Sequence, residues 1–209
     1  MKLQTLANNN PNYQDQIIKI VGSLLGLSKE KITLNYKKIE LSPTQVKEIN
    51  GYIKKLKQGV PLPYLTQKQF FFDHKFNVNN NVLIPRFETE ILVSEAIDLL
   101  RGVKKGNVID IGTGSGNIIT SISKAAGSGL NYYGVDISKD ALQTAKKNAI
   151  DNGVKNIKFM ESDLFSNKNL PKKFELILAN LPYLESDYLN MLPKQLADKL
   201  QYEPSVALD

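Results

Sequence analysis

The first sixty residues carry apolar side chains at helical spacing. Residues 13–26 end in a glycine and repeat apolar residues every three or four positions, at Ile17, Ile18, Val21, Leu24 and Leu25. This spacing is typical of an amphipathic helix. Ser28 and Ser42 are candidate N-caps, and Pro43 follows the second at the first helical position, where proline is tolerated. We therefore expect three or four short helices that form a small bundle domain over residues 1–60.

Residues 61–86 lose the helical pattern. Pro61 and Pro63 argue against a helix, and two short β-rich runs lie on either side of Asp73 and His74. We expect this segment to be a hairpin linker between two domains. His74 is the only histidine in the chain, and it has no second His or Cys beside it. A surface turn position is therefore favoured over a metal ligand or a catalytic base.

Strands and helices alternate from residue 87 onward. A helical run over residues 88–100 precedes four apolar runs with the composition of strands, NVIDIG, NYYGVD, NIKFMES and FELILANLPY. A helical pattern follows each of the first two, and Ser138 and Gly153 mark the ends of the second helix. Such alternation predicts right-handed crossovers and a parallel, doubly wound sheet. We expect an α/β domain over residues 87–209, with its first four strands in the spatial order 3-2-1-4.

The composition excludes several classes of protein. The chain has no run of roughly 20 apolar residues, so no transmembrane helix is expected. It has no cysteine, which excludes disulfides, thiolate metal sites and cysteine nucleophiles. Its start lacks the apolar core of a secretory signal. We expect a cytoplasmic enzyme or binding protein.

The net charge of +6 is unevenly distributed. Residues 1–105 carry a balance of +7, and residues 106–209 carry a balance of −1. A basic first half is typical of a module that faces an acidic partner, such as RNA or a ribosome-bound protein. A Lys-rich surface that serves only solubility explains the asymmetry equally well, so the charge does not identify a partner.

The first strand of the α/β domain runs into a glycine-rich turn. The segment contains, in order, Asp110, Gly112, Thr113, Gly114, Ser115 and Gly116. Glycines at such positions allow a sharp turn into a helix and a close approach of a ligand to the backbone. Asp136 ends the next strand, where a carboxylate can accept both hydroxyls of a ribose. The turn and Asp136 together favour an adenosyl ligand over a purely structural turn.

The third strand ends in a second acidic segment, Glu161-Ser162-Asp163-Leu164. A carboxylate at this strand tip can accept a hydrogen bond from an adenine amine, and Leu164 can pack on the ring. Open α/β sheets bind ligands at the carboxyl ends of their parallel strands. The sequence has no G-x-x-x-x-G-K phosphate loop. An adenosyl ligand without a phosphate cradle points to S-adenosylmethionine.

The fourth strand ends in Asn180-Leu181-Pro182-Tyr183. An amide nitrogen is a poor nucleophile because its lone pair is delocalised into the carbonyl. The Asn180 side-chain oxygen and the Leu181 carbonyl oxygen are suited to accept both hydrogens of a planar NH₂ group, with Tyr183 packed on its plane. Positioning and desolvation would then carry most of the catalysis. An ordinary Asn-Pro turn at a strand end stays open as the alternative.

The order and spacing of the motifs resemble the release factor glutamine methyltransferase family (HemK/PrmC). The motifs are VLIPRFETEILV, DIGTGSG, VDIS, SDLF and NLPY, and the final YEPSVALD resembles a family segment that follows N-P-P-Y. The resemblance implies a class I S-adenosylmethionine-dependent methyltransferase with a Rossmann-like sheet. Its reaction would methylate the side-chain amide nitrogen of the glutamine in the Gly-Gly-Gln motif of peptide chain release factors. The helical first domain would dock this substrate, and the family's C-terminal strands would be missing from the sheet, since its chains continue past position 209.

The resemblance also implies a set of site residues. The cofactor site would comprise Asp110, Gly112, Thr113, Gly114, Ser115, Gly116, Asp136, Asp163, Leu164 and Asn180. The acceptor glutamine would contact Asn180, Leu181, Pro182 and Tyr183, together with Arg86, Glu88 and Thr89. Within this set Asn180, Pro182 and Tyr183 are the catalytic candidates. No metal is expected.

Some features leave alternatives open. Phe87 and Leu181 stand where the family usually has proline, and Leu164 stands where an aromatic residue is common. N-L-P-Y is also the motif of rRNA adenine dimethyltransferases, so an adenine amine in RNA or DNA is the alternative acceptor, and an inactive cofactor-binding fragment is another. Arg86 and Glu88 equally fit an ion pair at a helix start. A release factor is the expected partner, and direct nucleic-acid binding is not favoured.

Overall fold

The computed structural model describes residues 1–127, 129–183, 191–192, 197 and 200–208. Residue contacts divide the chain into two compact units, Met1–Thr66 and Gln67–Asp209. Each unit has a hydrophobic core of its own. The predicted linker over residues 61–86 spans the boundary between them. No described helix is long and apolar enough to cross a membrane.

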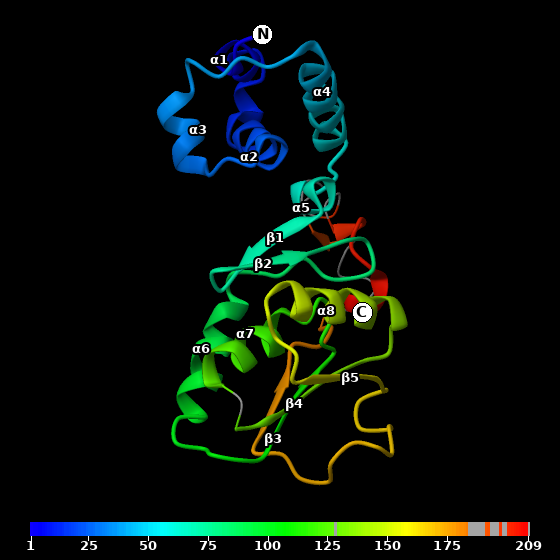
Figure 1. Ribbon diagram of the computed structural model, residues 1–209. Helices are drawn as coiled ribbons and strands as arrows, with labels where there is room; N and C mark the ends of the chain where they lie inside the picture. The colour runs from blue at the N-terminus through cyan, green and yellow to red at the C-terminus, as the bar shows by residue number, and fades with distance from the viewer. Residues whose placement is uncertain (128, 184–190, 193–196, 198–199, 209) are drawn as a thin grey trace. The chain divides into compact units, whose positions relative to one another are not determined.

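The first unit is a small bundle of helices (Figure 1). Its elements are α1 (Leu3–Asn8), the 3₁₀ turn η1 (Pro11–Tyr13), α2 (Gln14–Leu25), α3 (Lys29–Asn35), α4 (Pro43–Lys57) and α5 (Leu62–Thr66). The apolar stripes expected from the sequence meet in one core, where Ile17 and Val21 of α2 are buried with Ile49 and Ile53 of α4. The helix α1 was not among the expected elements, and its Leu3 is also fully buried in this core.

The helix ends in this unit follow the expected capping residues. The Ser28 hydroxyl accepts a hydrogen bond from the Lys31 N–H at 3.3 Å. Ser42 and Gln45 form a reciprocal capping box at the start of α4, whose first residue is Pro43. These caps satisfy backbone N–H groups that have no partner inside the helix.

The expectation that two prolines exclude a helix after residue 60 is wrong. Residues Leu62–Thr66 form the single helical turn α5, with Pro61 just before it and Pro63 at its second position. The N–H groups in the first turn of a helix donate no intrahelical hydrogen bond, so a proline there removes none.

β1 (Lys68–Phe71) and β2 (His74–Asn77) form the expected antiparallel hairpin. Phe72 and Asp73 make its two-residue turn with φ angles of 48° and 58°, the left-handed pair that closes tight hairpins. His74 is the first residue of β2 rather than part of the turn. The hairpin belongs to the second unit.

A four-stranded sheet organises the second unit. Its strands are β3 (Asn107–Ile111), β4 (Asn131–Asp136), β5 (Ile157–Glu161) and β6 (Leu176–Ala179). They are parallel and lie in the order β5-β4-β3-β6, which confirms the predicted order 3-2-1-4. The register pairs Asp136 with Glu161 and Ile111 with both Val135 and Ala179. The carboxyl ends of all four strands therefore lie together at the same end of the sheet.

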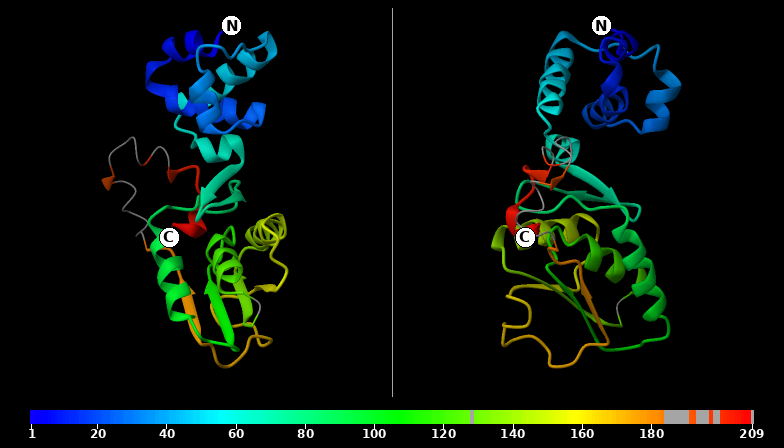
Figure 2. Two further views of the ribbon diagram at one scale, coloured as in Figure 1. Left: turned by 60° about the vertical axis from the view of Figure 1, so that its left-hand side comes forward. Right: turned by 180° about the vertical axis from the view of Figure 1, so that it is seen from behind.

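The helices of this unit are α6 (Thr89–Leu99), α7 (Asn117–Ala126) and α8 (Lys139–Asp151), seen from two further sides in Figure 2. On one face of the sheet Val93 of α6 and Ile119 of α7 are buried with Tyr132 and Leu178 of the strands. On the other face Tyr133 packs with Phe174, from the segment between β5 and β6. The fold is the predicted α/β class with a parallel sheet.

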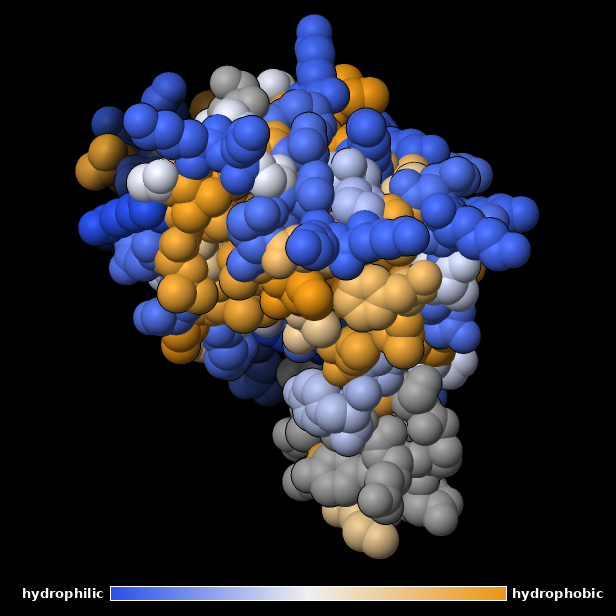
Figure 3. Space-filling model, turned by 90° about the horizontal axis from the view of Figure 1, so that it is seen from below, coloured by the Kyte–Doolittle hydropathy of each residue, from blue (hydrophilic) through white to orange (hydrophobic). Residues whose placement is uncertain are grey.

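Several large apolar side chains of the second unit stay exposed. Leu99, Ile177 and Phe165 have exposed fractions of 67%, 52% and 50%. Apolar side chains gather on the face of the molecule seen in Figure 3. In the described part of the chain β6 is an edge strand, so Ile177 lies where an added strand would pair.

Candidate functional site

A cavity of about 390 Å³ opens at the carboxyl ends of the four parallel strands. The predicted site residues that line it are Arg86, Thr89, Gly112, Thr113, Gly114, Ser115, Asp136, Asp163, Leu164, Asn180, Leu181 and Pro182. Asp110, Gly116, Glu88 and Tyr183 do not line it. The structure therefore gathers in one place residues that are up to about a hundred positions apart in the sequence.

The glycine-rich turn between β3 and α7 needs its glycines for two reasons. Gly112, Gly114 and Gly116 have φ angles of 67°, 52° and 73°, a left-handed conformation that side chains with a Cβ rarely adopt. A Cβ on Gly112 would also lie 2.8 Å from Leu181 Cδ2. The turn thus lets the ends of β3 and β6 approach closely at the cavity.

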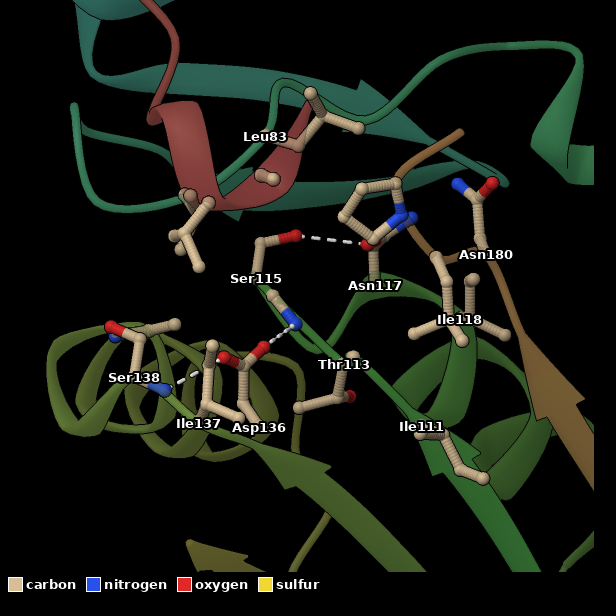
Figure 4. A pocket seen from close by; sticks show the side chains of 18 of the residues that line it. Leu83, Ile111, Thr113, Ser115, Asn117, Ile118, Asp136, Ile137, Ser138 and Asn180 are labelled. Atoms are coloured by element: carbon tan, nitrogen blue, oxygen red, sulfur yellow. Dashed lines mark hydrogen bonds between the residues drawn. The ribbon is translucent and has the colours of Figure 1, made fainter. Parts of the chain in front are cut away.

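Asp136 holds the turn from the end of β4. Its Oδ2 accepts the Gly114 N–H at 2.8 Å and its Oδ1 accepts the Ser138 N–H at 2.9 Å, as Figure 4 shows. Ser138 also caps α8, since its hydroxyl accepts the Ala141 N–H at 3.2 Å. A carboxylate oxygen has a second lone pair, so each oxygen of Asp136 retains the capacity to accept another donor from the cavity.

Asp110 lies behind the turn and is fully buried. Its Oδ2 accepts the Thr113 hydroxyl at 2.7 Å, while its Oδ1 has no partner among the described residues. The pKa of Asp110 is raised to about 7, chiefly because the carboxyl is buried and also because of the nearby charge of Asp136, while the Thr113 hydrogen bond acts in the opposite direction. Asp110 therefore supports the turn through Thr113 instead of facing the cavity.

The end of β5 presents a strained residue to the cavity. Leu164 has a φ of 48°, an uncommon conformation for a residue with a branched side chain. Its carbonyl accepts the Ser162 hydroxyl at 2.8 Å, and the residue is 49% exposed. Asp163 lines the cavity beside it. Backbone strain of this kind concentrates at ligand sites.

The N-L-P-Y segment follows β6 directly. Asn180, Leu181 and Pro182 line the cavity, and Asn180 lies above Ile118 at the end of its strand in Figure 4. Tyr183 is 84% exposed. The segment thus offers a carboxamide and a backbone carbonyl at the cavity and an aromatic ring at the surface.

Arg86 forms its ion pair with Glu203 and not with Glu88. Glu203, Val206 and Ala207 were not among the predicted site residues, although the last two line the cavity. The only sequence signal for them was the likeness of the final YEPSVALD to a family segment.

A further residue that the sequence pattern did not indicate is Asn148 in α8. It is fully buried, and its amide group donates to the Ser115 carbonyl at 2.9 Å and to the Asn77 carbonyl at 3.0 Å. Its oxygen accepts the Asn77 backbone N–H at 2.7 Å. Asn148 therefore ties the hairpin to the glycine-rich turn. No local pattern distinguishes it from any polar residue of a helix.

The described residues hold no group of three or more His, Cys, Asp and Glu side chains arranged to bind a metal ion. The residues that line the cavity instead carry hydroxyls, carboxamides, the carboxylates of Asp136 and Asp163, the guanidinium of Arg86 and apolar groups. This donor set suits an organic ligand with hydrogen-bonding and apolar parts.

Comparison with known proteins decides the family. A family model described as a methyltransferase domain matches residues 103–203. A release factor glutamine methyltransferase of Leptospira interrogans is 38% identical over 193 residues, which cover 90% of this chain and 65% of that protein. One of Buchnera aphidicola subsp. Schizaphis graminum is 34% identical over 201 residues, which cover 95% of this chain and 68% of that protein. The chain belongs to the release factor glutamine methyltransferase family.

This membership confirms the resemblance inferred from the motifs. The chain spans between 51% and 68% of the length of these relatives and of one from Fusobacterium nucleatum. Among solved structures, the catalytic domain of hMettl16 in complex with MAT2A 3′UTR hairpin 6 matches with a TM-score of 0.50 and 17% identity, over 66% of this chain and 51% of that one. That likeness concerns the methyltransferase fold.

Proposed function

We propose that this chain transfers a methyl group from S-adenosylmethionine to the side-chain amide nitrogen of the glutamine in the Gly-Gly-Gln motif of peptide chain release factors. One observation carries the proposal: the glycine-rich turn after β3 and the N-L-P-Y segment after β6 line the same cavity in a member of this family. The reaction would take place in the cytoplasm, because the protein substrate acts in translation.

The residues around the cavity fit an adenosyl group. Asp136 has one free lone pair on each oxygen for the two ribose hydroxyls. Leu164 offers an exposed apolar surface to the adenine, and the Asp163 carboxylate beside it offers an acceptor to the adenine amine. The cavity volume of about 390 Å³ lies within the range of roughly 300–1,000 Å³ that small-molecule sites occupy.

The N-L-P-Y segment is suited to hold the acceptor amide. The Asn180 side-chain oxygen and the Leu181 carbonyl oxygen would accept the two N–H hydrogens of the glutamine side chain. Pro182 restricts the backbone of Leu181 and so limits the directions in which that carbonyl can point. Tyr183, exposed at the surface, would pack on the plane of the amide once the substrate is bound.

Chemistry of this kind depends chiefly on positioning. The bound cofactor would supply a methyl group on a positively charged sulfur. The chain's own residues would align the amide nitrogen with that group and exclude water, which lowers the barrier without a strong base. The amide nitrogen sheds its extra proton to solvent after the new bond has formed.

A methyl-transfer assay tests the proposal. The purified chain is incubated with S-adenosylmethionine labelled in its methyl group, together with a release factor or a release factor whose Gly-Gly-Gln glutamine is changed to asparagine. We expect label in the first protein and none in the second. Binding of the cofactor without label in the release factor would refute the proposal, and label in an RNA oligonucleotide instead would favour the adenine-amine alternative.

A further inference from the structure

Two irregular segments far apart in the sequence form one wall of the cavity. Residues 81–86 precede α6, and residues 204–207 contain the 3₁₀ turn η2 (Ser205–Ala207). Both contribute lining residues, among them Leu83 and Val206. Figure 4 shows Leu83 and this turn across the cavity from Asp136. Neither segment lies in a sheet or a long helix that would fix its position.

Glu203 joins the two segments. Its Oε1 accepts a hydrogen bond from Arg86 Nη2, and its Oε2 accepts the Ile84 N–H at 3.4 Å. The side chain of Glu203 is 2% exposed, whereas that of Arg86 is 39% exposed. Among the described residues, the partners of the Glu203 carboxylate therefore come from the first segment, and Glu203 itself immediately precedes the second.

The Glu203 carboxylate depends on its contacts with Arg86 and Ile84 because it is buried. A buried charge is tolerated only when a counter-charge and hydrogen bonds replace the water that it has lost. Arg86 supplies the charge and Ile84 supplies a backbone donor. If Arg86 lost its charge, Glu203 would have to move toward solvent or take up a proton, and Val206 and Ala207 would shift with it.

We infer that Arg86 and Glu203 are positioning residues of the cofactor pocket, whose ion pair holds residues 204–207 in place as its wall. The identity of the ligand rests on the proposed function, while the role of the pair rests on the contacts of Glu203. In this role Arg86 acts through Glu203. Cofactor affinity thus depends on a contact between residues 117 positions apart.

The test is a double-mutant cycle with S-adenosylhomocysteine as the calorimetric probe. Arg86→Gln and Glu203→Gln should each weaken binding about tenfold or more, and the double variant should be no more than about threefold weaker than either, because residues that act as a pair are non-additive. Arg86→Lys retains the positive charge but lacks the planar guanidinium with its several N–H donors, so it should bind more tightly than Arg86→Gln and less tightly than the parent. The exposed pair Arg101–Asp98, at 2.9 Å, supplies the control, and Arg101→Gln should bind within about twofold of the parent.

Two further readouts separate positioning from simple stabilisation. Circular dichroism melts identify a temperature at which every variant is folded, and calorimetry is done there. In the methylation assay the variants should raise KM for the cofactor about tenfold and change kcat less than about threefold, since the groups that hold the acceptor stay in place. A lower melting temperature with unchanged affinity and KM would overturn the inference.

The outcomes for the two proposals are distinguishable. If the parent binds S-adenosylhomocysteine but does not methylate a release factor, the proposed function fails, and the affinity series still decides the role of the pair. If the parent methylates the release factor and the folded Arg86→Gln and Glu203→Gln variants bind the probe as the parent does, the inference about the pair is wrong and the proposed function stands.

Discussion

Replacing Asp136 with alanine should remove most of the cofactor affinity. Two ribose hydroxyls would donate to a charged carboxylate, and each such hydrogen bond is worth about 1.5–3 kcal/mol. The combined loss of about 3–6 kcal/mol corresponds to roughly 10²–10⁴-fold in affinity, at about 1.4 kcal/mol per factor of ten. Calorimetric titration with S-adenosylhomocysteine measures this loss directly.

Asp136 also accepts the backbone N–H groups of Gly114 and Ser138, so part of the loss will come from a loosened turn. A ligand without the ribose 2′-hydroxyl separates the two effects. The parent should bind this deoxy ligand at least about tenfold more weakly than S-adenosylhomocysteine, because one hydrogen bond to a charged group contributes at least that factor to the affinity. Asp136→Ala should bind the two ligands almost equally.

Asp140 supplies the matched control, because it is an exposed carboxylate in the first turn of α8 and does not line the cavity. Asp140→Ala removes the same charge nearby and should bind S-adenosylhomocysteine within about twofold of the parent, as expected for an exposed charge. If Asp136→Ala stayed within about threefold of the parent, well below the value of a single charged hydrogen bond, the placement of the ribose would be wrong.

Three further predictions follow from the site and from the sheet edge. Asn180→Ala should abolish methyl transfer and leave cofactor affinity within about tenfold, because lost orientation lowers turnover; single-turnover kinetics that stay within a few-fold of the parent would refute this role. The pKa of Asp110 is about 7 in the folded chain and near 4 in the unfolded chain, so the free energy of unfolding of the parent should fall as the pH rises from about 4 to about 7, relative to that of Asp110→Asn. Urea titrations in which the free energies of unfolding of parent and variant change equally with pH would contradict the burial effect. β6 has no strand partner on its outer side among the described residues, so the 209-residue chain should self-associate, and Ile177→Lys should reduce that association in light scattering; a monodisperse parent would contradict this prediction.

Local patterns predicted much of the fold because the relevant physics is local. Ser42 and Pro43 predict a helix start because an N-cap serine and a proline at the first position fit the geometry of the first turn. Helix α4 begins there, with Ser42 as its N-cap. The glycines of the turn after β3 have the positive φ angles that their spacing suggested. The parallel sheet followed from the alternation of strands and helices, since consecutive parallel strands need right-handed crossovers.

Features that depend on tertiary contacts could not be predicted in this way. Glu203 meets Ile84 across 119 positions of sequence, and no local spacing points to that pair. Asn148 is indistinguishable in sequence from a solvated helix residue, yet it is fully buried. Tyr183 was expected at the site from its motif, but the residue is 84% exposed and does not line the cavity, so its packing on the acceptor stays a prediction.

Localising the methyl group on the substrate tests the central claim most directly. A release factor is incubated with the purified chain and S-adenosylmethionine, digested, and mapped by mass spectrometry, with the Asn180→Ala variant as the control. We predict the added mass of one methyl group on the side chain of the Gly-Gly-Gln glutamine, and an unmodified peptide with the variant. An unmodified glutamine with the parent chain, or a methyl group on another residue, would contradict the account.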